Sequence, residues 1–572
     1  MSRDFVDRVE MQNRLFSELS RMFGEEVPLY DKSLAVNLVC NRAVCALVGR
    51  RFPGFSMSDE QINLTSGERH GAIRIGRPDE YRWIGRFFSV FAMEPHNFYD
   101  MASIGAKSQP VIATAFRSEA YPEHRVFSSL LMTDYFDEAT QERVETLLSD
   151  RCVFSDRAKA LIEKDESEGG LNREDFEALI HEGTDRIFKW TGRARDHQLY
   201  KDLCEGGFKI AADIACFDSH HLNHLTPNTF CMDLYTSAMK YALGEYDEAA
   251  LRLRAGAALE RIRVDGDRDY MTLHFKHLTR AEIDGLPETD VSGSVVDELI
   301  DGLVDRLNEP DLDLSKLDHA GFKDFTEGPA VGTPVLLRQD AYKALTEAVV
   351  FHNPDGTETR TVHTARFGEI EQRFYATTPK GRAMYDQCLA EHEEARSQDP
   401  GLAKRDFEAY QAAQIQAYAT FPKTLGELLE QGLVYGRYEP TDAGLAAAGS
   451  IQTSDLRTLV QQGYVRADGL RYEDFLPFSA AGIFASNLNQ YGTTSTARQR
   501  KEYSQEMLEE ILGKPIVDTD RSYRGMEAQS VLKTYERLGL TGWLSEAELS
   551  RLKKDAEGCP VGVSRRSTAL VK

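Results

Sequence analysis

The chain has 572 residues, of which 41% are hydrophobic and 28% charged, and its formal net charge is −24. A chain of this length and composition can bury several ordinary domains or one large core. The acidic balance excludes a general affinity for nucleic acid or for anionic membranes, because both require a basic surface.

The first residues are acidic where a signal or transit peptide would be basic and apolar. No run of about 20 apolar residues predicts a membrane span. The eight cysteines are scattered, without a Cys-x-x-Cys pair. We therefore expect a cytoplasmic protein with reduced thiols and no disulfide scaffold. Cys216 and Cys231 flank a histidine cluster and remain open as soft metal ligands.

Residues 1–235 alternate between predicted helices and strands. Helical spacing of apolar residues predicts helices at 5–23, ended by Gly24, and at 33–50. Further helices are expected at 77–99, 138–164 and 172–190, the last two separated by Gly169-Gly170. Strands are expected at 110–117, 125–131 and 214–217.

Residues 68–76 (ERHGAIRIG) have the composition of a short strand that lies close to another backbone. His70 and Arg74, four residues apart, can point to the same face of that strand. An imidazole and a guanidinium on one face could supply a metal ligand beside a clamp for a carboxylate. The alternative is a structural arginine that pairs with an acid such as Glu68.

Residues 220–227 (HHLNHLTP) contain three of the chain's 14 histidines. His220 and His224 would share one face of either a helix or a strand. Pro227 disfavours helix at the preceding residue, so the cluster is expected where an element ends. Imidazole suits Fe, Zn, Cu and Ni. A metal site and a hydrogen-bonded histidine corner both remain open on these residues alone.

Residues 281–320 differ in composition from the rest. They hold 12 Asp and Glu against 2 Lys and Arg, which gives 12 − 2 = 10 of the 24 net negative charges. With the helical run at 236–263, they predict an inserted, acidic and solvated helical subdomain. The predicted domains are 1–235 and 321–500 (two parts of one core), 236–320 (the insertion) and 501–572 (a helical extension and tail).

The second part of the core contains a predicted strand at 361–374 (TVHTARFGEIEQRF), after a strand at 334–338 and a helix at 340–350. Its alternation places Glu369, Glu371 and Arg373 on one face. Neighbouring like charges on one face require a cation or hydrogen bonds, so a metal or an arginine partner is expected. His363 could contact a metal ligand or be a satisfied strand histidine. Helices are predicted at 382–397, 405–435 and beyond 500.

Four motifs occur in order along the chain: ERHGAIR (68–74), HLNHLTP (221–227), TARFGEIEQR with TPKGR (364–373, 378–382), and YEDFLP…SAAGIF (472–484). This series resembles the 2-oxoadipate dioxygenase/decarboxylase family, over roughly residues 10–235 and 320–500. The resemblance implies an α+β fold whose mixed β-sheet core is similar to the vicinal-oxygen-chelate fold and is wrapped by many helices.

The resemblance also implies a single Fe(II) held by His70, His224 and one of the paired glutamates. We choose Glu371 as this ligand, with Glu369 in reserve. Arg74 matches the family's arginine for the substrate carboxylate. Phe478 and Ser479 match the loop that contacts substrate, in an apolar segment that suits a substrate wall.

Two histidines and one carboxylate with open positions form the facial triad of non-haem Fe(II) oxygenases. The family reaction converts 2-oxoadipate and O2 to 2-hydroxyglutarate and CO2, as in lysine degradation. Positioning by Arg74 could lower the barrier by about 7–11 kcal/mol. Phe374 and Phe478 are bulkier than the family's usual residues, which affects the choice of substrate and leaves the metal residues intact.

Two other interpretations remain open. A site of two histidines and one glutamate also binds Zn and could catalyse hydrolysis or a lyase reaction on a small carboxylate. A catalytically inactive interaction protein could use 281–320 for docking. His220 and His221 are expected to orient their loop. The oligomeric state is not determined by these patterns.

Overall fold

The computed structural model of the protein describes residues 5–67, 69–102, 108–118, 122–476 and 502–560. Its central element is a five-stranded sheet in the order β2-β3-β4-β1-β6. Strand β1 is parallel to β4 and antiparallel to β6, whereas β3 is antiparallel to both β2 and β4. The strands span Arg69–Ile75 (β1), Glu94–Asp100 (β2), Val111–Arg117 (β3), His124–Leu131 (β4) and His224–Pro227 (β6).

Three smaller sheets complete the strand arrangement in the part of the chain that is described. One pairs β7 with β10, one has the order β5-β8-β9, and one pairs β11 with β12. A bridge between Asn228 and Glu371 places β10 beside the end of β6. These strands span Arg193–Arg195 (β5), Leu337–Ala341 (β7), Thr346–His352 (β8), Glu358–Thr364 (β9), Glu369–Arg373 (β10), Gly436–Pro440 (β11) and Val465–Gly469 (β12).

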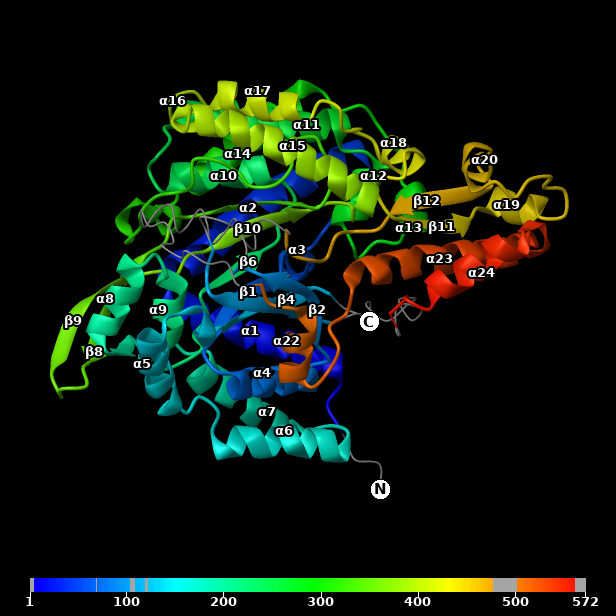
Figure 1. The fold of residues 1–572 in the computed structure, drawn as a ribbon. Coiled ribbons are helices and arrows are strands. Elements are labelled where there is room, and N and C mark those ends of the chain that lie inside the picture. The colour runs from blue at the N-terminus through cyan, green and yellow to red at the C-terminus, as the bar shows by residue number, and fades with distance from the viewer. Residues whose placement is uncertain (1–4, 68, 103–107, 119–121, 477–501, 561–572) are drawn as a thin grey trace.

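Helices cover these sheets on several sides (Figure 1). The N-terminal half contains Arg8–Glu26 (α1), Pro28–Arg51 (α2), Asp59–Ser66 (α3), Pro78–Val90 (α4), Glu138–Ser149 (α5), Asp156–Glu168 (α6), Arg173–Glu182 (α7), His197–Glu205 (α8), Lys209–Cys216 (α9), Met232–Ala242 (α10) and Glu248–Asp265 (α11). They are followed by Arg268–His274 (α12), Arg280–Asp284 (α13), Gly293–Leu307 (α14), Pro379–Gln398 (α15), Leu402–Arg405 (α16), Phe407–Ala417 (α17), Leu425–Glu430 (α18), Asp442–Ala447 (α19), Leu456–Gln461 (α20), Gln505–Leu512 (α22), Thr519–Leu538 (α23) and Glu546–Ala556 (α24).

Helix α2 is the one described helix that is long and apolar enough to cross a membrane. However, 61% of its most apolar window is buried inside the protein. It contacts α1, α10, α11 and α14, and buried residues such as Val36 and Val44 lie along it. A helix that is apolar on most sides is typical of a protein core. We therefore interpret α2 as the central core helix.

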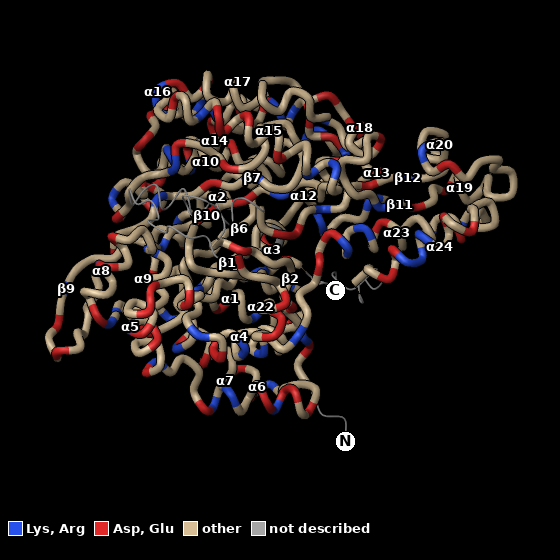
Figure 2. The backbone as a smooth tube through the Cα atoms, in the orientation of Figure 1, with Lys and Arg blue, Asp and Glu red and all other residues tan. Residues whose placement is uncertain are grey.

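The predicted insertion at 236–320 is helical, and its helices share the main core with the N-terminal helices and the central sheet. Leu251 and Leu303 belong to the same buried cluster as Met11 and Ile73. Acidic and basic segments are interspersed across this helical layer in Figure 2. Arg252, for example, pairs with Asp301 at 2.7 Å, so part of the acidic face is neutralised internally.

Several predicted elements are confirmed, among them α1, α2, α15 and strands β1, β3 and β4. The prediction of one helix at 138–164 is wrong, because Asp137 and Ser155 cap two separate helices, α5 and α6. Helix α1 continues past Gly24 to Glu26, and 77–99 is divided between α4 and β2. The region 405–435 likewise contains two helices, α17 and α18.

Two predictions had the wrong element type. Residues 214–217 are not a strand, because α9 runs to Cys216 and all of its residues are buried. A short, fully buried apolar run has no period that separates helix from strand. Residues 340–350 are not a helix, because Thr346–His352 forms β8 between β5 and β9. Long-range strand pairing there overrides the local helix preference of its alanine and glutamate residues.

The observed architecture is α+β, with mixed sheets surrounded by many helices, as predicted. The closer comparison with the vicinal-oxygen-chelate fold, and the division into domains, stay predictions.

Candidate functional site

Strands β1 and β6 bring His70 and His224 together. In their antiparallel register, Ala72 lies opposite His224 and His70 opposite Thr226, so both imidazoles share one face of the sheet. A Cβ at Gly71 would lie 3.1 Å from the backbone oxygen of His224, so glycine permits this close approach. The two imidazole ring centroids are 5.4 Å apart.

Strand β10 adds two carboxylates to the same place. Glu369 Oε2 lies 3.1 Å from His70 Nε2 and 3.4 Å from His224 Nε2. Glu371 Oε2 lies 2.7 Å from the other ring nitrogen of His70, Nδ1. The candidate ligand atoms of His70, His224 and Glu369 all lie within 4.8 Å of one another. The structure thus brings both predicted histidines together with both predicted glutamates.

The two glutamates differ in how their oxygens are used. Arg373 donates from Nε to Glu371 Oε1 at 2.7 Å and from Nη2 to Oε2 at 2.9 Å, and Arg125 Nη1 lies 3.8 Å from Oε1. Glu369 Oε2 accepts from Thr226 Oγ1 at 3.1 Å. Among the described residues, Glu369 Oε1 and both ring nitrogens of His224 are buried without a hydrogen-bond partner. Glu369, the reserve choice, therefore has an open oxygen, and Glu371 does not.

Burial and charge set the protonation of this cluster. Burial lowers the pKa of His224 to about 4, although the nearby Glu369 opposes that shift. Burial would also lower the pKa of His70, but the Glu371 and Glu369 carboxylates raise it above its ordinary value. Burial raises the pKa of Glu371, yet Arg373 and His70 together hold it at about 2. The cluster thus keeps its carboxylates ionised despite burial.

Aromatic rings surround the histidines. The Phe475 ring meets His70 edge-on at 4.8 Å, and the Phe367 ring stacks on His224 at 4.9 Å. Such walls exclude water and strengthen the electrostatic interactions inside. Phe475 belongs to the fourth motif, and sequence reasoning did not single it out. The predicted substrate residues Phe478 and Ser479 lie outside the described residues.

Arg74, the fourth predicted site residue, is paired within an adjacent buried network, although its charge still acts on His224. Its Nη1 donates to Asp213 Oδ2 on α9 at 2.6 Å, and Lys209 Nζ lies 3.2 Å from the other oxygen of Asp213. His363 Nδ1 lies 2.8 Å from the Tyr200 hydroxyl and 3.0 Å from Lys209 Nζ. His363 is therefore a hydrogen-bonded strand histidine. No local signal pointed to Asp213 or Lys209, because the helix that carries them was not predicted and its last residues were predicted as a strand.

A second buried cluster contains His220, Glu80 and Arg151; we call it the His220 cluster. Arg151 donates to both oxygens of Glu80, at 3.3 and 2.7 Å, and His220 Nε2 lies 3.4 Å from Glu80 Oε2. The His221 ring contacts the Trp190 ring edge-on at 4.7 Å. These histidines therefore fix the segment that leads to β6.

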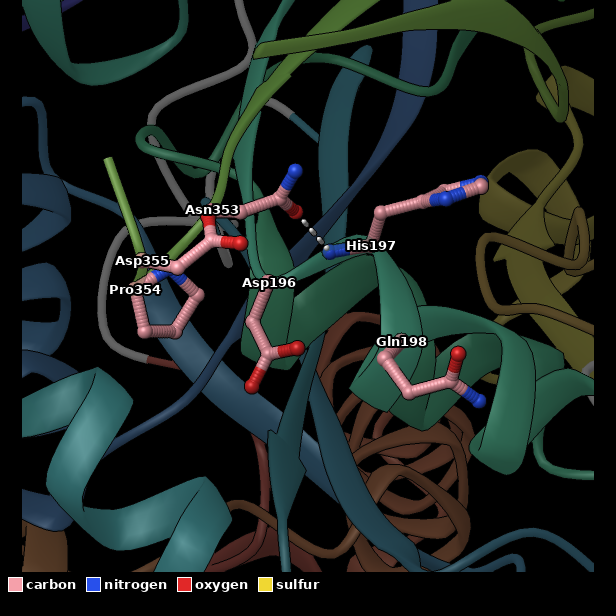
Figure 3. A pocket seen from close by; sticks show the side chains of 6 residues that line it. All are labelled: Asp196, His197, Gln198, Asn353, Pro354 and Asp355. Atoms are coloured by element: carbon pink, nitrogen blue, oxygen red, sulfur yellow. Dashed lines mark hydrogen bonds between the residues drawn. The ribbon is translucent and has the colours of Figure 1, made fainter. Parts of the chain in front are cut away.

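The remaining predicted residues lie elsewhere. All eight cysteines are free thiols, and the cluster of possible metal ligands contains neither Cys216 nor Cys231. The Phe374 ring lies 6.0 Å from the His274 ring. An open hollow between the start of α8 and the β8–β9 turn is lined by Asp196, His197, Gln198, Asn353, Pro354 and Asp355 (Figure 3). None of these six residues belongs to the group of His70, His224, Glu369 and Glu371, which we call the His70 site.

Comparison with known proteins identifies the family. The profile of the 2-oxoadipate dioxygenase/decarboxylase family matches residues 15–244 and 295–487, so residues 245–294 of the predicted insertion lie outside the match. The Pseudomonas putida enzyme of that name is 32% identical over 94% of this chain and 99% of its own. The Escherichia coli enzyme of that name is 30% identical over 91% and 97%.

A solved structure agrees with this. The crystal structure of the Pseudomonas putida hydroxyglutarate synthase in complex with 2-oxoadipate is similar with a TM-score of 0.65 and 30% identity, over 94% of this chain and 100% of that one. Family match, relatives and structure all extend over most of the chain. This chain is therefore an enzyme of the 2-oxoadipate dioxygenase/decarboxylase family.

Proposed function

We propose that this protein is an Fe(II)-dependent dioxygenase that decarboxylates a 2-oxo dicarboxylic acid, 2-oxoadipate, with O2 to give 2-hydroxyglutarate and CO2. The observation that carries the proposal is the buried group of His70, His224 and Glu369, in a chain whose relatives bear the name of this activity. Such a reaction belongs to lysine degradation, and we place it in the cytoplasm.

The residues at the site fit a divalent metal. Two imidazoles and one carboxylate are the ligand set of non-haem Fe(II) oxygenases. His224 and Glu369 each have a buried polar atom that no described residue satisfies, and buried polar atoms are normally paired with protein, water or an ion. A cation among these three residues would satisfy both. We therefore assign the carboxylate ligand to Glu369 in place of our first choice, Glu371.

When bound, iron would supply the oxygen and redox chemistry, and its uncoordinated positions would accept the 2-oxo acid. The chain's own contribution is to hold three ligands on neighbouring strands and to exclude water. The rings of Phe475 and Phe367 cover the two histidines. In a site without water, a charged substrate loses its hydration shell. Fixed charges of the protein then take the place of the water molecules around it.

Arg74 would bind a carboxylate of the substrate. It lies on the same strand as His70 and, at a spacing of four residues, on the same face. A guanidinium matches a carboxylate through two parallel hydrogen bonds. Because Arg74 already pairs with Asp213, substrate binding would require Arg74 to share its donors between two carboxylates.

Anaerobic loading with Fe(II), followed by 2-oxoadipate and O2, tests the proposal. Oxygen uptake and formation of 2-hydroxyglutarate are expected together, and loading with Zn(II) should support neither. Turnover with Zn(II) and without oxygen uptake would instead support a hydrolase or lyase. Iron binding without conversion of 2-oxoadipate would keep the oxygenase and exclude this substrate.

A further inference from the structure

The two ring nitrogens of His70 face different groups. Nε2 points to Glu369, 3.1 Å away, on the side where His224 also lies. Nδ1 lies 2.7 Å from Glu371 Oε2. A neutral imidazole has one donor and one acceptor nitrogen, and the hydrogen bond at one nitrogen determines which lone pair is left at the other. The partner of Nδ1 therefore decides whether Nε2 can bind a cation.

Glu371 is held as a fixed acceptor. Arg373 grips both of its oxygens in a fork at 2.7 and 2.9 Å. The backbone oxygen of Glu371 accepts a hydrogen bond from the Thr229 amide at 2.8 Å. With both oxygens bound by an arginine, Glu371 stays ionised and presents Oε2 to His70 in one orientation.

The same arginine also fixes the wall of the site. Arg373 Nη1 donates to the backbone oxygens of Asp474 at 2.9 Å and Tyr472 at 3.2 Å. Arg125, the other cation near Glu371, donates from Nε to the backbone oxygen of Glu473 at 2.6 Å. Phe475, which covers His70, follows directly. Glu371 thus links the histidine to the segment that covers it.

We propose that Glu371 is a positioning residue: it accepts the Nδ1–H of His70 and so aims the Nε2 lone pair at the cation position between Glu369 and His224. The inference rests on the proposed metal site and adds to it a role for the second glutamate. Carboxylates that accept from a metal-bound histidine orient the ring and make it a stronger ligand, and their loss typically lowers metal affinity about 10–100-fold.

The test compares Glu371→Gln with Glu80→Gln in the full-length protein loaded with Co(II). Glu80 is a matched control, because it is also buried, accepts from two nitrogens of one arginine and lies beside a histidine, yet belongs to the His220 cluster. Calorimetry gives the Co(II) dissociation constant. Proton NMR in H2O and D2O detects the strongly shifted, exchangeable N–H protons of metal-bound histidines.

In Glu371→Gln the dissociation constant should rise about 10–100-fold, and one shifted N–H resonance should move and exchange faster with solvent. Glu80→Gln should reproduce the wild-type constant and spectrum, whatever its melting temperature. An unchanged constant and spectrum in Glu371→Gln would overturn the positioning role. So would a visible absorption band of Co(II) that shows one ligand fewer, as expected for Glu369→Gln, because Glu371 would then be a ligand.

The outcomes separate this inference from the proposed function. If wild type binds no Co(II) or Fe(II), the metal site itself fails. If wild type binds metal and Glu371→Gln binds it as wild type does, the metal site stands and the positioning role fails. Glu371→Met, of similar length but with only a weakly accepting thioether, should weaken binding at least as much as Glu371→Gln.

Discussion

The His70 site and the His220 cluster are built from the same parts. In each, two nitrogens of an arginine donate hydrogen bonds to a buried glutamate, and a histidine lies beside that glutamate. In each, the arginine also holds backbone oxygens: Arg373 those of Tyr472 and Asp474, and Arg151 those of Ile214 and Phe217. The shared arrangement is therefore structural.

What differs is a second carboxylate. At His220, burial lowers the pKa of the histidine, although Glu80 partly opposes this. At His70, Glu371 and Glu369 together outweigh burial and raise the pKa. Glu80 is neutralised by Arg151, whereas Glu369 is left with an open oxygen beside a second histidine. The extra glutamate and the second histidine thus distinguish the candidate cation site from the His220 cluster.

The largest effect is expected on stability, at the His220 cluster. Glu80→Ala leaves Arg151 buried without its carboxylate, and breaking a buried pair in this way costs about 3–5 kcal/mol. Chemical denaturation should show this loss, while the affinity for Co(II) should remain that of wild type. A loss of metal affinity equal to that of a site variant would erase the distinction between the two clusters.

The next effect is on metal binding. Glu369→Gln removes a charged ligand and should weaken Co(II) binding by more than about 100-fold, or about 2.8 kcal/mol. This exceeds the effect expected for an outer carboxylate such as Glu371. Calorimetry on both variants checks the order. A weaker effect in Glu369→Gln than in Glu371→Gln would return the ligand role to Glu371.

A smaller effect is expected from Arg373→Lys. Lysine keeps the charge but cannot grip a carboxylate with two nitrogens in a plane. Glu371 should then be held less firmly, and Co(II) affinity should fall about tenfold, or about 1.4 kcal/mol. Arg151→Lys is the matched control and should leave the affinity unchanged. Equal affinities in the two variants would contradict a link from Arg373 through Glu371 to the metal.

The smallest effect concerns pH. The pKa of His220 is lower in the folded than in the unfolded protein, chiefly by burial, with Arg151 and Arg77 adding to it and Glu80 opposing it. The unfolded chain therefore takes up a proton first as pH falls below about 6.5. The stability that neutral His220 contributes is fully present above that pH and is lost as the pH falls below it. Wild type should lose more stability between pH 7.5 and 5.5 than His220→Gln; an equal loss would refute this.

Sequence patterns predicted most residues of the candidate site, but not which glutamate we propose as the metal ligand. His70 and His224 could be paired in advance, because both lie in recognisable motifs. The choice between Glu369 and Glu371 could not be made from a strand period of two, which places both on one face. It rests on Arg373, which donates to both oxygens of Glu371, and on Arg125, which lies 3.8 Å from the same carboxylate and comes from a strand far away in sequence. Distant contacts of this kind leave no local pattern.

The same limit explains the errors in the fold. Residues 214–216 are apolar and lie at the end of a helix that is buried on every side, so the sequence 214–217 resembled a buried strand. Residues 346–352 form a strand because β5 and β9 lie on either side. Asp213 and Phe475 were missed for the same reason, since their roles arise from partners elsewhere in the chain. Amphipathic helices such as α1 were predictable because their pattern is local.

A crystal structure of the protein loaded anaerobically with Fe(II), with diffraction data collected at the iron absorption edge, tests the central claim most directly. We expect one anomalous peak within bonding distance of His70 Nε2, His224 and Glu369, with Glu371 hydrogen-bonded to His70 Nδ1. A peak bonded to Glu371 in place of Glu369, or no peak between the two histidines, would contradict this account.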